Sequence, residues 1–227
     1  MPSVLWMHDY LTDGDIRPEH REAVKGRPIV AVSDFHLSNV RKHLGGDVLW
    51  RIYNPVDVGV NYCDHKQPYA VILSSPCKGL ESSLEVFAAM DKQWSLVILN
   101  PGYEPSPQID TKRVKTLGPK PHKDAMRVLA SASLLIHANR RFPETFGLVY
   151  AEAKVLGVPV LTCGHGAARE VLGDAPGILP IDAPVQKMAK VGNRLMRTPT
   201  PPCPGIFAPE DAALEWQTLL KGVSTAG

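Results

Sequence analysis

Short apolar runs rich in β-branched residues alternate with helix-like stretches along the chain, and this alternation constrains the fold more than any other feature. The helix-like stretches include 80–90, 122–132 and 148–157. Strands that alternate with helices are typical of βαβ units, in which helices cover both faces of a parallel sheet. Ligands of such sheets bind at the carboxyl ends of the strands. The predicted strands are SVLWM (3–7), PIVAV (28–32), VLWRIY (48–53), YAVIL (69–73), SLVIL (95–99), VKTL (114–117), SLLIHA (133–138), VPVLT (158–162) and GILPI (177–181).

The composition is that of an ordinary soluble globular protein. The 227 residues, 44% hydrophobic and 21% charged with a net charge of +2, suffice for one large domain or two small ones and do not by themselves indicate a nucleic-acid partner. There is no run of about eighteen apolar residues, so we expect no membrane span. The start MPSVLWMHDY lacks the basic and long apolar regions of a secretory signal, so we expect a cytoplasmic protein. The cysteines lie far apart without a C-x-x-C, which favours reduced thiols.

Several common catalytic motifs are missing from the sequence. It contains no D-x-D in a suitable place, no H-E-x-x-H and no grouped histidines and cysteines, so we expect no metal site. A G-x-G-x-x-G after a strand is also missing, which disfavours a dinucleotide oxidoreductase. The lack of G-x-S-x-G disfavours an α/β-hydrolase.

Glu144 and Glu152 lie eight residues apart in the segment RRFPETFGLVYAEAKVLGVPVL. The pattern predicts a loop that ends at Phe146 and a helix that begins near Gly147. A helix N-terminus offers free N–H groups and a positive dipole end, which favour phosphate. Together with two carboxylates that accept from hydroxyl groups, it suits a sugar attached to a diphosphate. Glutamates near a helix start also stabilise helices without any chemistry, so their spacing alone decides nothing.

The residues around this pair are more specific. PETFGLVYAEAKVLGVPVL resembles the E-x7-E signature of retaining GT-B glycosyltransferases, especially glycosyltransferase family 4. The resemblance covers the first Glu, the Phe-Gly, the second Glu followed by Ala, and the Gly-x-Pro-Val step into the next strand. It implies an α/β, GT-B-like fold with two Rossmann-like parallel-sheet domains. It also implies a metal-independent, hexosyltransferase-like enzyme that uses a UDP- or GDP-type nucleoside-diphosphate sugar as co-substrate and no cofactor.

The resemblance also divides the chain. NPVD (54–57) is similar to the linker that opens the C-terminal domain in this family. We predict a shortened N-terminal, acceptor-side domain at 1–66, a nucleotide-sugar-binding domain at 67–199, and a Pro-rich connector with a C-terminal helix at 200–227. The glycine-rich loop that begins the family's N-terminal domain is missing. Because a small sheet of three strands leaves exposed edges, we expect a homodimer.

The expected diphosphate site lies in SSPCKGL, between a predicted strand and a helix. Lys78 is the natural phosphate cation, and the hydroxyl groups of Ser74 and Ser75 can add donors. The family usually has an arginine a few residues before this Lys-Gly, and here it is missing. Arg140 or Arg141 could replace it, although paired arginines on a loop are more often only solvated.

The helix start should supply further donors. We expect the backbone N–H groups of Phe146, Gly147 and Leu148 to contribute to phosphate binding. The turn TCGHGAARE is similar to a glycine-rich turn that precedes a short helix in the family, where His165 and Glu170 would be supporting residues.

The resemblance assigns the sugar and the nucleotide to particular residues. Glu144 would bind the hydroxyl groups of the donor sugar on the reacting side, and Glu152 the ribose hydroxyls. The family places a histidine at the end of an early strand, facing the sugar, and His8 is the candidate here. The segment 118–124 is a candidate wall for the base, with His122 expected to be an ordinary surface residue.

We therefore expect a retaining glycosyltransferase whose acceptor is a glycan, a lipid, a small molecule or a modified base in DNA. The basic segment 17–27 could meet a DNA backbone, although a charged helix face is the ordinary explanation. One alternative is a non-catalytic nucleotide-sugar-binding or partner subunit of a glycosyltransferase complex, which the missing loop and arginine favour. Another is a sugar-phosphate epimerase of the related fold.

Overall fold

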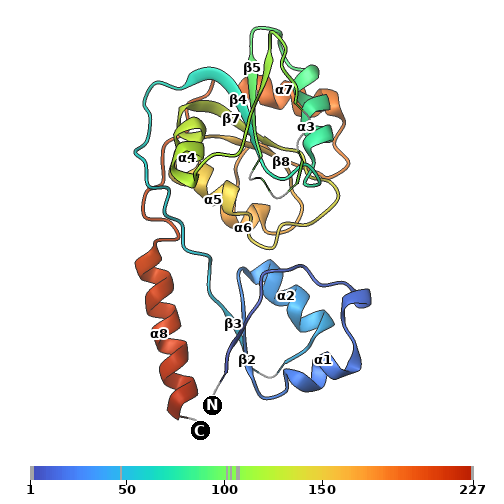
Figure 1. Cartoon of the computed structure of the whole chain (residues 1–227), viewed down its shortest axis with the longest axis vertical. Helices are drawn as coiled ribbons and strands as arrows, with labels where there is room; N and C mark the ends of the chain where they lie inside the picture. The colour runs from blue at the N-terminus through green and yellow to red at the C-terminus, as the bar shows by residue number, and fades with distance from the viewer. Residues whose placement is uncertain (1–2, 47, 101, 103, 106–107, 226–227) are drawn as a thin grey trace.

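The structure of the protein is a computed structural model that describes residues 3–46, 48–100, 102, 104–105 and 108–225. Two α/β domains, each with its own parallel sheet, are stacked along the long axis of the molecule (Figure 1). Each predicted apolar run overlaps a strand, so the alternation predicted from the sequence is confirmed. Within the described residues, no helix has both the length and the apolar character needed to cross a bilayer.

The N-terminal domain contains a small sheet with helices on both faces. Ile29 and Ala31 point to one face, where they pack with Val40 of α2, and Val30 points to the other. This follows from the period of two along a strand. All strand pairs in the small sheet are parallel. Its strands, in the order β1-β2-β3, and its helices are β1 (Leu5–Trp6), β2 (Pro28–Ala31), β3 (Val48–Arg51), a 3-10 turn (Asp13–Asp15), α1 (Pro18–Ala23) and α2 (Asp34–His43).

The C-terminal helix α8 (Pro209–Thr225) lies against the small sheet rather than the large one. Its residues Ala212 and Leu219 are buried with Val30 and Ile52 of the N-terminal domain. Figure 1 shows the chain leaving the large domain and running back beside the small sheet. The last helix therefore completes the core of the first domain.

The large sheet is parallel throughout and has the strand order β6-β5-β4-β7-β8-β9. Its central strands are almost entirely apolar, as expected for strands covered on both faces. The strands are β4 (Gln67–Leu73), β5 (Ser95–Leu99), β6 (Val114–Leu117), β7 (Ala132–His137), β8 (Val160–Cys163) and β9 (Ile178–Leu179).

Two layers of helices cover the large sheet. Val71 and Leu135 point to the layer formed by α4, α5 and α6, whereas Ile72 and Leu134 point to the layer formed by α3 and α7. The helices are α3 (Leu80–Ala88), α4 (His122–Ser131), α5 (Leu148–Val155), α6 (Ala168–Leu172) and α7 (Val185–Leu195).

The strand order creates a topological switch point between β4 and β7. From β4 the chain continues outward to β5 and β6, and from β7 it continues in the opposite direction to β8 and β9. At such a point the loops after two neighbouring strands diverge and leave a crevice outside their carboxyl ends. Here those loops are 74–79 and 138–147, which carry most of the predicted site.

The connection between the domains is packed. Val56 and Val58 of the linker are buried in the core of the large domain. The N–H of Val56 donates to the carbonyl O of Phe207 at 2.9 Å. Tyr53 packs edge-on against the ring of Phe207, with centroids 5.1 Å apart. The limits predicted for the domains, 1–66, 67–199 and 200–227, stay a prediction.

Candidate functional site

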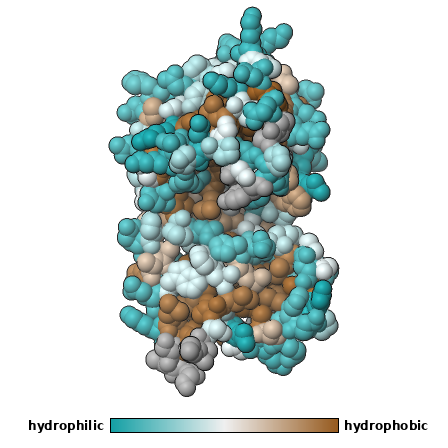
Figure 2. All heavy atoms as spheres, in the orientation of Figure 1, coloured by the Kyte–Doolittle hydropathy of each residue, from teal (hydrophilic) through white to brown (hydrophobic). Residues whose placement is uncertain are grey.

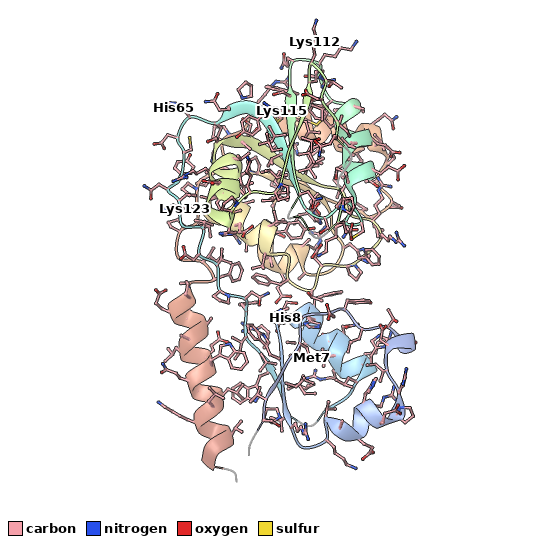
Figure 3. The ribbon with its side chains drawn as sticks, viewed as in Figure 1. Met7, His8, His65, Lys112, Lys115 and Lys123 are labelled. Carbon is pink, nitrogen blue, oxygen red and sulfur yellow. The ribbon has the colours of Figure 1, made fainter. Side chains whose placement is uncertain are left out.

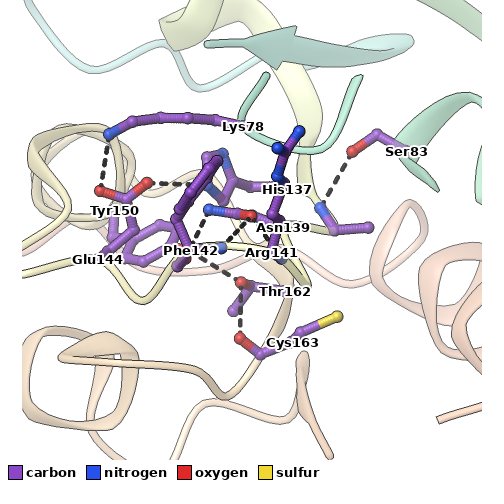
Figure 4. Close-up of polar contacts among 11 residues, drawn as sticks. Lys78, Ser83, His137, Asn139, Arg141, Phe142, Glu144, Tyr150, Thr162 and Cys163 are labelled. Carbon is purple, nitrogen blue, oxygen red and sulfur yellow. Dashed lines mark hydrogen bonds and ion pairs between the residues drawn. The ribbon is translucent and has the colours of Figure 1, made fainter. Parts of the chain in front are cut away.

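The loops after β4 and β7 touch at the switch point, and a glycine permits the contact. Gly79 ends the first loop with a φ of +87°. A Cβ there would lie 2.7 Å from the Cα of Asn139 and 2.9 Å from the carbonyl O of Ala138, so only glycine fits without a backbone shift. Segments 74–79 and 138–147 therefore lie side by side (Figure 4).

Lys78 and Glu144 meet where these loops join. The Nζ of Lys78 lies 3.1 Å from Oε2 of Glu144. The glutamate side chain is only 11% exposed, whereas the lysine side chain is 45% exposed. Ser74 and Ser75 lie partly exposed in the same loop, and the carbonyl O of Ser75 accepts from the N–H of Lys78. The structure thus brings the predicted cation and the first predicted carboxylate together, while their roles stay predictions.

Behind Glu144 lies a histidine that the sequence analysis did not single out. His137 is the last residue of β7, a strand whose residues are all buried. Its Nε2 lies 3.4 Å from Oε1 of Glu144, and its ring meets the ring of Tyr150 edge-on, with centroids 5.2 Å apart. The only available signal was one polar residue at the carboxyl end of an apolar run, which also describes many structural histidines.

These contacts set the charge of Glu144. Burial by itself raises the pKa of Glu144, but His137 and Lys78 outweigh it and hold the pKa at about 2. The carboxylate is therefore ionised at neutral pH and can only accept hydrogen bonds. Burial raises the pKa of Tyr150 as well, and its hydroxyl lies 3.0 Å from Oγ1 of Thr162. Tyr150 thus stays neutral beside the charged pair.

The backbone around Glu144 is fixed on both sides. Asn139 donates to the carbonyl O of Phe142 at 2.8 Å, and its Oδ1 accepts from two backbone N–H groups of the same loop. The carbonyl O of Glu144 accepts from the N–H of Ala167 at 2.9 Å. Gly166, with a φ of +76°, lies so close that a Cβ would overlap the backbone of Glu144. The glycine-rich turn before α6 therefore supports the loop that carries the glutamate.

Helix α5 begins at Leu148 with Gly147 as its N-cap, which confirms the predicted helix start. Among the described residues no side chain caps this N-terminus, which leaves the N–H groups of its first turn without a side-chain acceptor. Leu148 is 48% exposed. Phe146 is buried instead, where its ring lies 5.9 Å from that of Tyr53 and 5.2 Å from that of Phe207. A phenylalanine at this position therefore anchors the loop to the junction of the domains.

Glu152 lies further along α5 and has a different partner. Its Oε1 is 2.9 Å from Nε2 of His122, the first residue of α4. The glutamate side chain is 13% exposed and the histidine side chain 57% exposed. The predicted base wall, 118–124, therefore lies beside Glu152. His122 is exposed, as predicted for a surface residue, and it also contacts the carboxylate expected to bind ribose.

The arginines proposed as a second phosphate cation point elsewhere. Arg140 donates to the carbonyl O of Ala183 at 2.6 Å, on the α7 side of the large domain. The guanidinium of Arg141 lies 5.0 Å above the ring of Phe142. In the described part of the chain, neither arginine contacts the carboxylate of Glu144. The suggestion that one of them replaces the missing arginine therefore receives no support from the geometry.

His8 follows β1 and is exposed, with its ring 4.4 Å from that of Trp6. Figure 3 shows it on the side of the N-terminal domain that faces the large domain. The described contacts do not join it to Glu144, so its predicted role on the sugar stays a prediction.

Hydrogen bonds join the domains near the candidate site. The hydroxyl of Ser33 donates to the carbonyl O of Thr145. The carboxylate of Glu170 accepts from the backbone N–H of Asp34 at 2.7 Å and of Phe35 at 3.0 Å, at the N-terminus of α2. Glu170, expected only as a supporting residue, therefore links α6 of the large domain to α2 of the small one.

Comparison with known families places this site in context. The family model described as "Glycosyl transferases group 1" matches residues 70–200, which include Lys78, Glu144 and Glu152. Among curated protein sequences, none matches this chain significantly.

Solved structures resemble most or nearly all of the chain. HepE from Anabaena, in complex with UDP-glucose, has a TM-score of 0.71 at 18% identity, over 99% of this chain and 72% of HepE. Sucrose-phosphate synthase from Thermosynechococcus elongatus has a TM-score of 0.68 at 16% identity, over 99% and 68%. WaaG, a glycosyltransferase involved in lipopolysaccharide biosynthesis, has a TM-score of 0.66 at 16% identity, over 87% and 67%. At these identities the likeness concerns the fold, and it confirms the GT-B-like α/β architecture.

Proposed function

The chain belongs to the glycosyl transferases group 1 family, and from this membership we propose that it is a retaining, family 4-like enzyme. It moves a hexose from a nucleoside-diphosphate sugar to an acceptor that binds on the side of the N-terminal domain. The observation that carries the proposal is the ion pair of Lys78 and Glu144 at the switch point, in the loops next to the uncapped N-terminus of α5. Charges of both signs and free N–H groups at one place suit a sugar diphosphate.

The diphosphate would lie against the half-exposed Lys78. Its ammonium group can turn from Glu144 toward phosphate, since the lysine side chain is flexible and partly in solvent. Ser74, Ser75 and the first N–H groups of α5 supply further donors. Together they stabilise the charge that develops as the diphosphate leaves.

The carboxylates would bind the two sugars of the donor. Glu144, ionised and held from behind, accepts from hydroxyl groups of the transferred sugar, and His8 faces it from the other domain. Glu152 accepts from the ribose hydroxyls, with His122 as its present partner. HepE holds UDP-glucose in its solved complex, which makes UDP-glucose the first donor to test.

Binding and turnover test the donor separately from the acceptor. Calorimetry with UDP and GDP should detect binding of one of them, and Lys78→Met should weaken it by about tenfold, as expected for a charged hydrogen bond. Glu144→Gln should lower turnover of UDP-glucose by about a hundredfold or more. Glu81→Gln, an exposed change on α3, is the control for both measurements.

The stereochemistry tests the retaining mechanism. The anomeric signal of the first product formed should show the configuration of the donor sugar in proton NMR. A product with the opposite anomeric configuration would contradict the retaining, family 4-like mechanism. Tight UDP binding without turnover on a glycan, lipid, small-molecule or DNA acceptor would instead favour the partner-subunit function, whose specific support is the small three-stranded domain.

We further propose that transfer needs no divalent ion, because Lys78 and the N–H groups of α5 supply positive charge for the diphosphate. In the described part of the chain, no group of three or more His, Cys, Asp or Glu side chains could hold a metal ion. Turnover should therefore be unchanged by EDTA, and restoration of activity by Mg²⁺ after chelation would contradict this.

We also propose that two copies of the chain associate through the small domain. Hydrophobic residues gather on the N-terminal domain in the face seen in Figure 2, and Trp6 and Trp50 at its two outer strands are 45% and 38% exposed. Apolar edges of a small sheet are sites of pairing. Sedimentation at micromolar protein should show a dimer, and a stable monomer would exclude this assembly.

A further inference from the structure

His137 is a buried polar residue without an ordinary partner. Its side chain is 1% exposed, and neither ring nitrogen has a hydrogen bond of normal geometry among the described residues. Most buried polar groups are hydrogen-bonded, and those that are not require an explanation. The nearest group of opposite charge is the carboxylate of Glu144, 3.4 Å from Nε2.

Among the described residues, the polar contact of the imidazole is with the carboxylate of Glu144. On one side, the ring of Tyr150 meets it edge-on at 5.2 Å, and the hydroxyl of this tyrosine is directed to Thr162 instead. The residues of β7 just before it, Leu134 to Ile136, are apolar and buried. The packing therefore holds the ring with one nitrogen facing Glu144, as Figure 4 shows.

His137 and Lys78 hold Glu144 in different ways. The lysine contacts Oε2 from a half-exposed position at the mouth of the site, and the histidine contacts Oε1 from the sealed interior. If Lys78 turns to a bound diphosphate, Glu144 loses that partner at the moment when it must accept from the sugar. The buried histidine cannot move away in the same manner.

We propose that His137 is a positioning residue that holds the carboxylate of Glu144 in place while Lys78 is engaged by the diphosphate of the donor. The donor half of this inference rests on the proposed function. The contact between His137 and Glu144 does not, because it exists without any ligand.

The electrostatics around Glu144 agree with this role. Burial opposes ionisation, and the favourable contributions come first from His137 and then from Lys78. Tyr150 also faces the carboxylate, and Cys163 lies next to that tyrosine, but burial raises the pKa of both groups, so they stay uncharged at neutral pH. Loss of the histidine should therefore raise the pKa of Glu144 more than loss of any other partner among the described residues.

A titration without ligand tests the contact. Carbon NMR of the labelled carboxyl of Glu144, assigned with Glu144→Gln, gives its pKa directly. His137→Leu should raise that pKa by about one unit or more, because a buried carboxylate loses a donor. His137→Gln, whose amide N–H can take the place of Nε2, should restore the wild-type value. An unchanged pKa in His137→Leu would overturn the inference.

A second variant keeps the test valid if His137→Leu does not fold. Lys78→Met removes only a half-exposed side chain and leaves Glu144 with His137 alone. The pKa of Glu144 should then stay below its ordinary value of 4.5. A pKa at or above that value would show that the histidine does not hold the carboxylate.

Addition of UDP tests the donor half. Saturating UDP should move the pKa of Glu144 in the wild type to that measured in Lys78→Met without ligand. If UDP binds but the pKa of Glu144 does not change, Lys78 does not move from Glu144 to the diphosphate. That result would contradict this half of the inference and leave the proposed function intact. Failure of UDP and GDP to bind at all would count against the proposed function, and the ligand-free titration would still decide on His137.

Turnover separates positioning from a merely structural effect. With UDP-glucose, His137→Leu should lower kcat at least tenfold and change KM little, since the lost orientation matters most as the sugar is transferred. His137→Gln should recover most of kcat. His43→Gln, a change at a buried histidine of the small domain whose ring contacts Asp13, is the control and should leave kcat unchanged. An equal loss of kcat in His137→Leu and in the control variant of the small domain would contradict the inference.

Discussion

Glu144 shows how a single residue carries both stability and chemistry. It is nearly buried, it is charged, and two partners hold it, one from the loop after β4 and one from the end of β7. A buried charge is tolerated only when partners compensate for the loss of water. The same partners keep it ionised at neutral pH. Removal of its charge should therefore change the stability of the protein in acid as well as lower its activity.

The stability of the wild type should fall in acid because of this residue. Its pKa is lowered from 4.5 to about 2, so the folded protein gains stability that is fully present above pH 4.5 and lost as the pH falls toward about 2. This corresponds to about 3 kcal/mol of unfolding free energy. Urea unfolding of Glu144→Gln across this range should lack that component, whereas Glu81→Gln should keep it.

Gly79 is the second residue on which the site depends. Gly79→Ala should destabilise the protein by about 1–3 kcal/mol, because a side chain at positive φ is strained and would press on the backbone of Asn139. It should also separate Lys78 from Glu144 and weaken UDP binding. Gly14→Ala, where the nearest atom to the new Cβ would be Thr12 Oγ1 at 3.8 Å, is the control in thermal unfolding. Equal midpoints in the two variants would contradict the steric explanation.

At the scale of elements, helix termini organise the site. The N-terminus of α5 has no side-chain cap among the described residues, whereas α2 is capped by its own Ser33 and additionally by Glu170 from the other domain. A carboxylate satisfies the free N–H groups of a helix start and matches its dipole. The cap therefore also fixes the position of α2 relative to the loop that carries Glu144.

Loss of this cap should loosen α2. Glu170→Ala should lower the unfolding free energy by about 1–2 kcal/mol, as for other lost caps. The amide protons of Asp34 and Phe35 should then exchange faster, as measured by hydrogen exchange. Glu170→Gln keeps one acceptor oxygen and should show a smaller effect. Unchanged exchange in Glu170→Ala would show that the contact does not hold the helix.

At the scale of the whole molecule, the two domains depend on each other through α8. The small sheet has only three strands, and α8, which follows the large domain in sequence, covers one of its faces. A domain of this size buries little apolar surface by itself. Its stability therefore depends on a helix from the far end of the chain.

Leu219 tests this dependence. The residue is 1% exposed between α8 and the small sheet, so Leu219→Ala should cost about 2–5 kcal/mol. The loss should appear in the N-terminal domain, as reduced hydrogen-exchange protection of β2. Leu214→Ala, at a position that is 65% exposed on the same helix, is the control. Loss of protection only in the large domain would contradict this view of α8.

The sequence by itself determined the elements and the chemistry of the predicted loops. Period-two and helical patterns predicted the strands and the start of α5, because these depend on neighbours along the chain. Lys78 and Glu144 could both be placed after strands, so both belonged at the carboxyl edge of a parallel sheet.

Only the tertiary structure decided which loops meet. The order β4-β7 puts Lys78 beside Glu144, and strand order depends on contacts between distant segments that no local pattern contains. The same holds for His137, for the bond between His122 and Glu152, and for the reach of Glu170 into the other domain. Each of these side chains meets its partner through tertiary packing. The local sequence around a polar residue does not predict which residue it will contact.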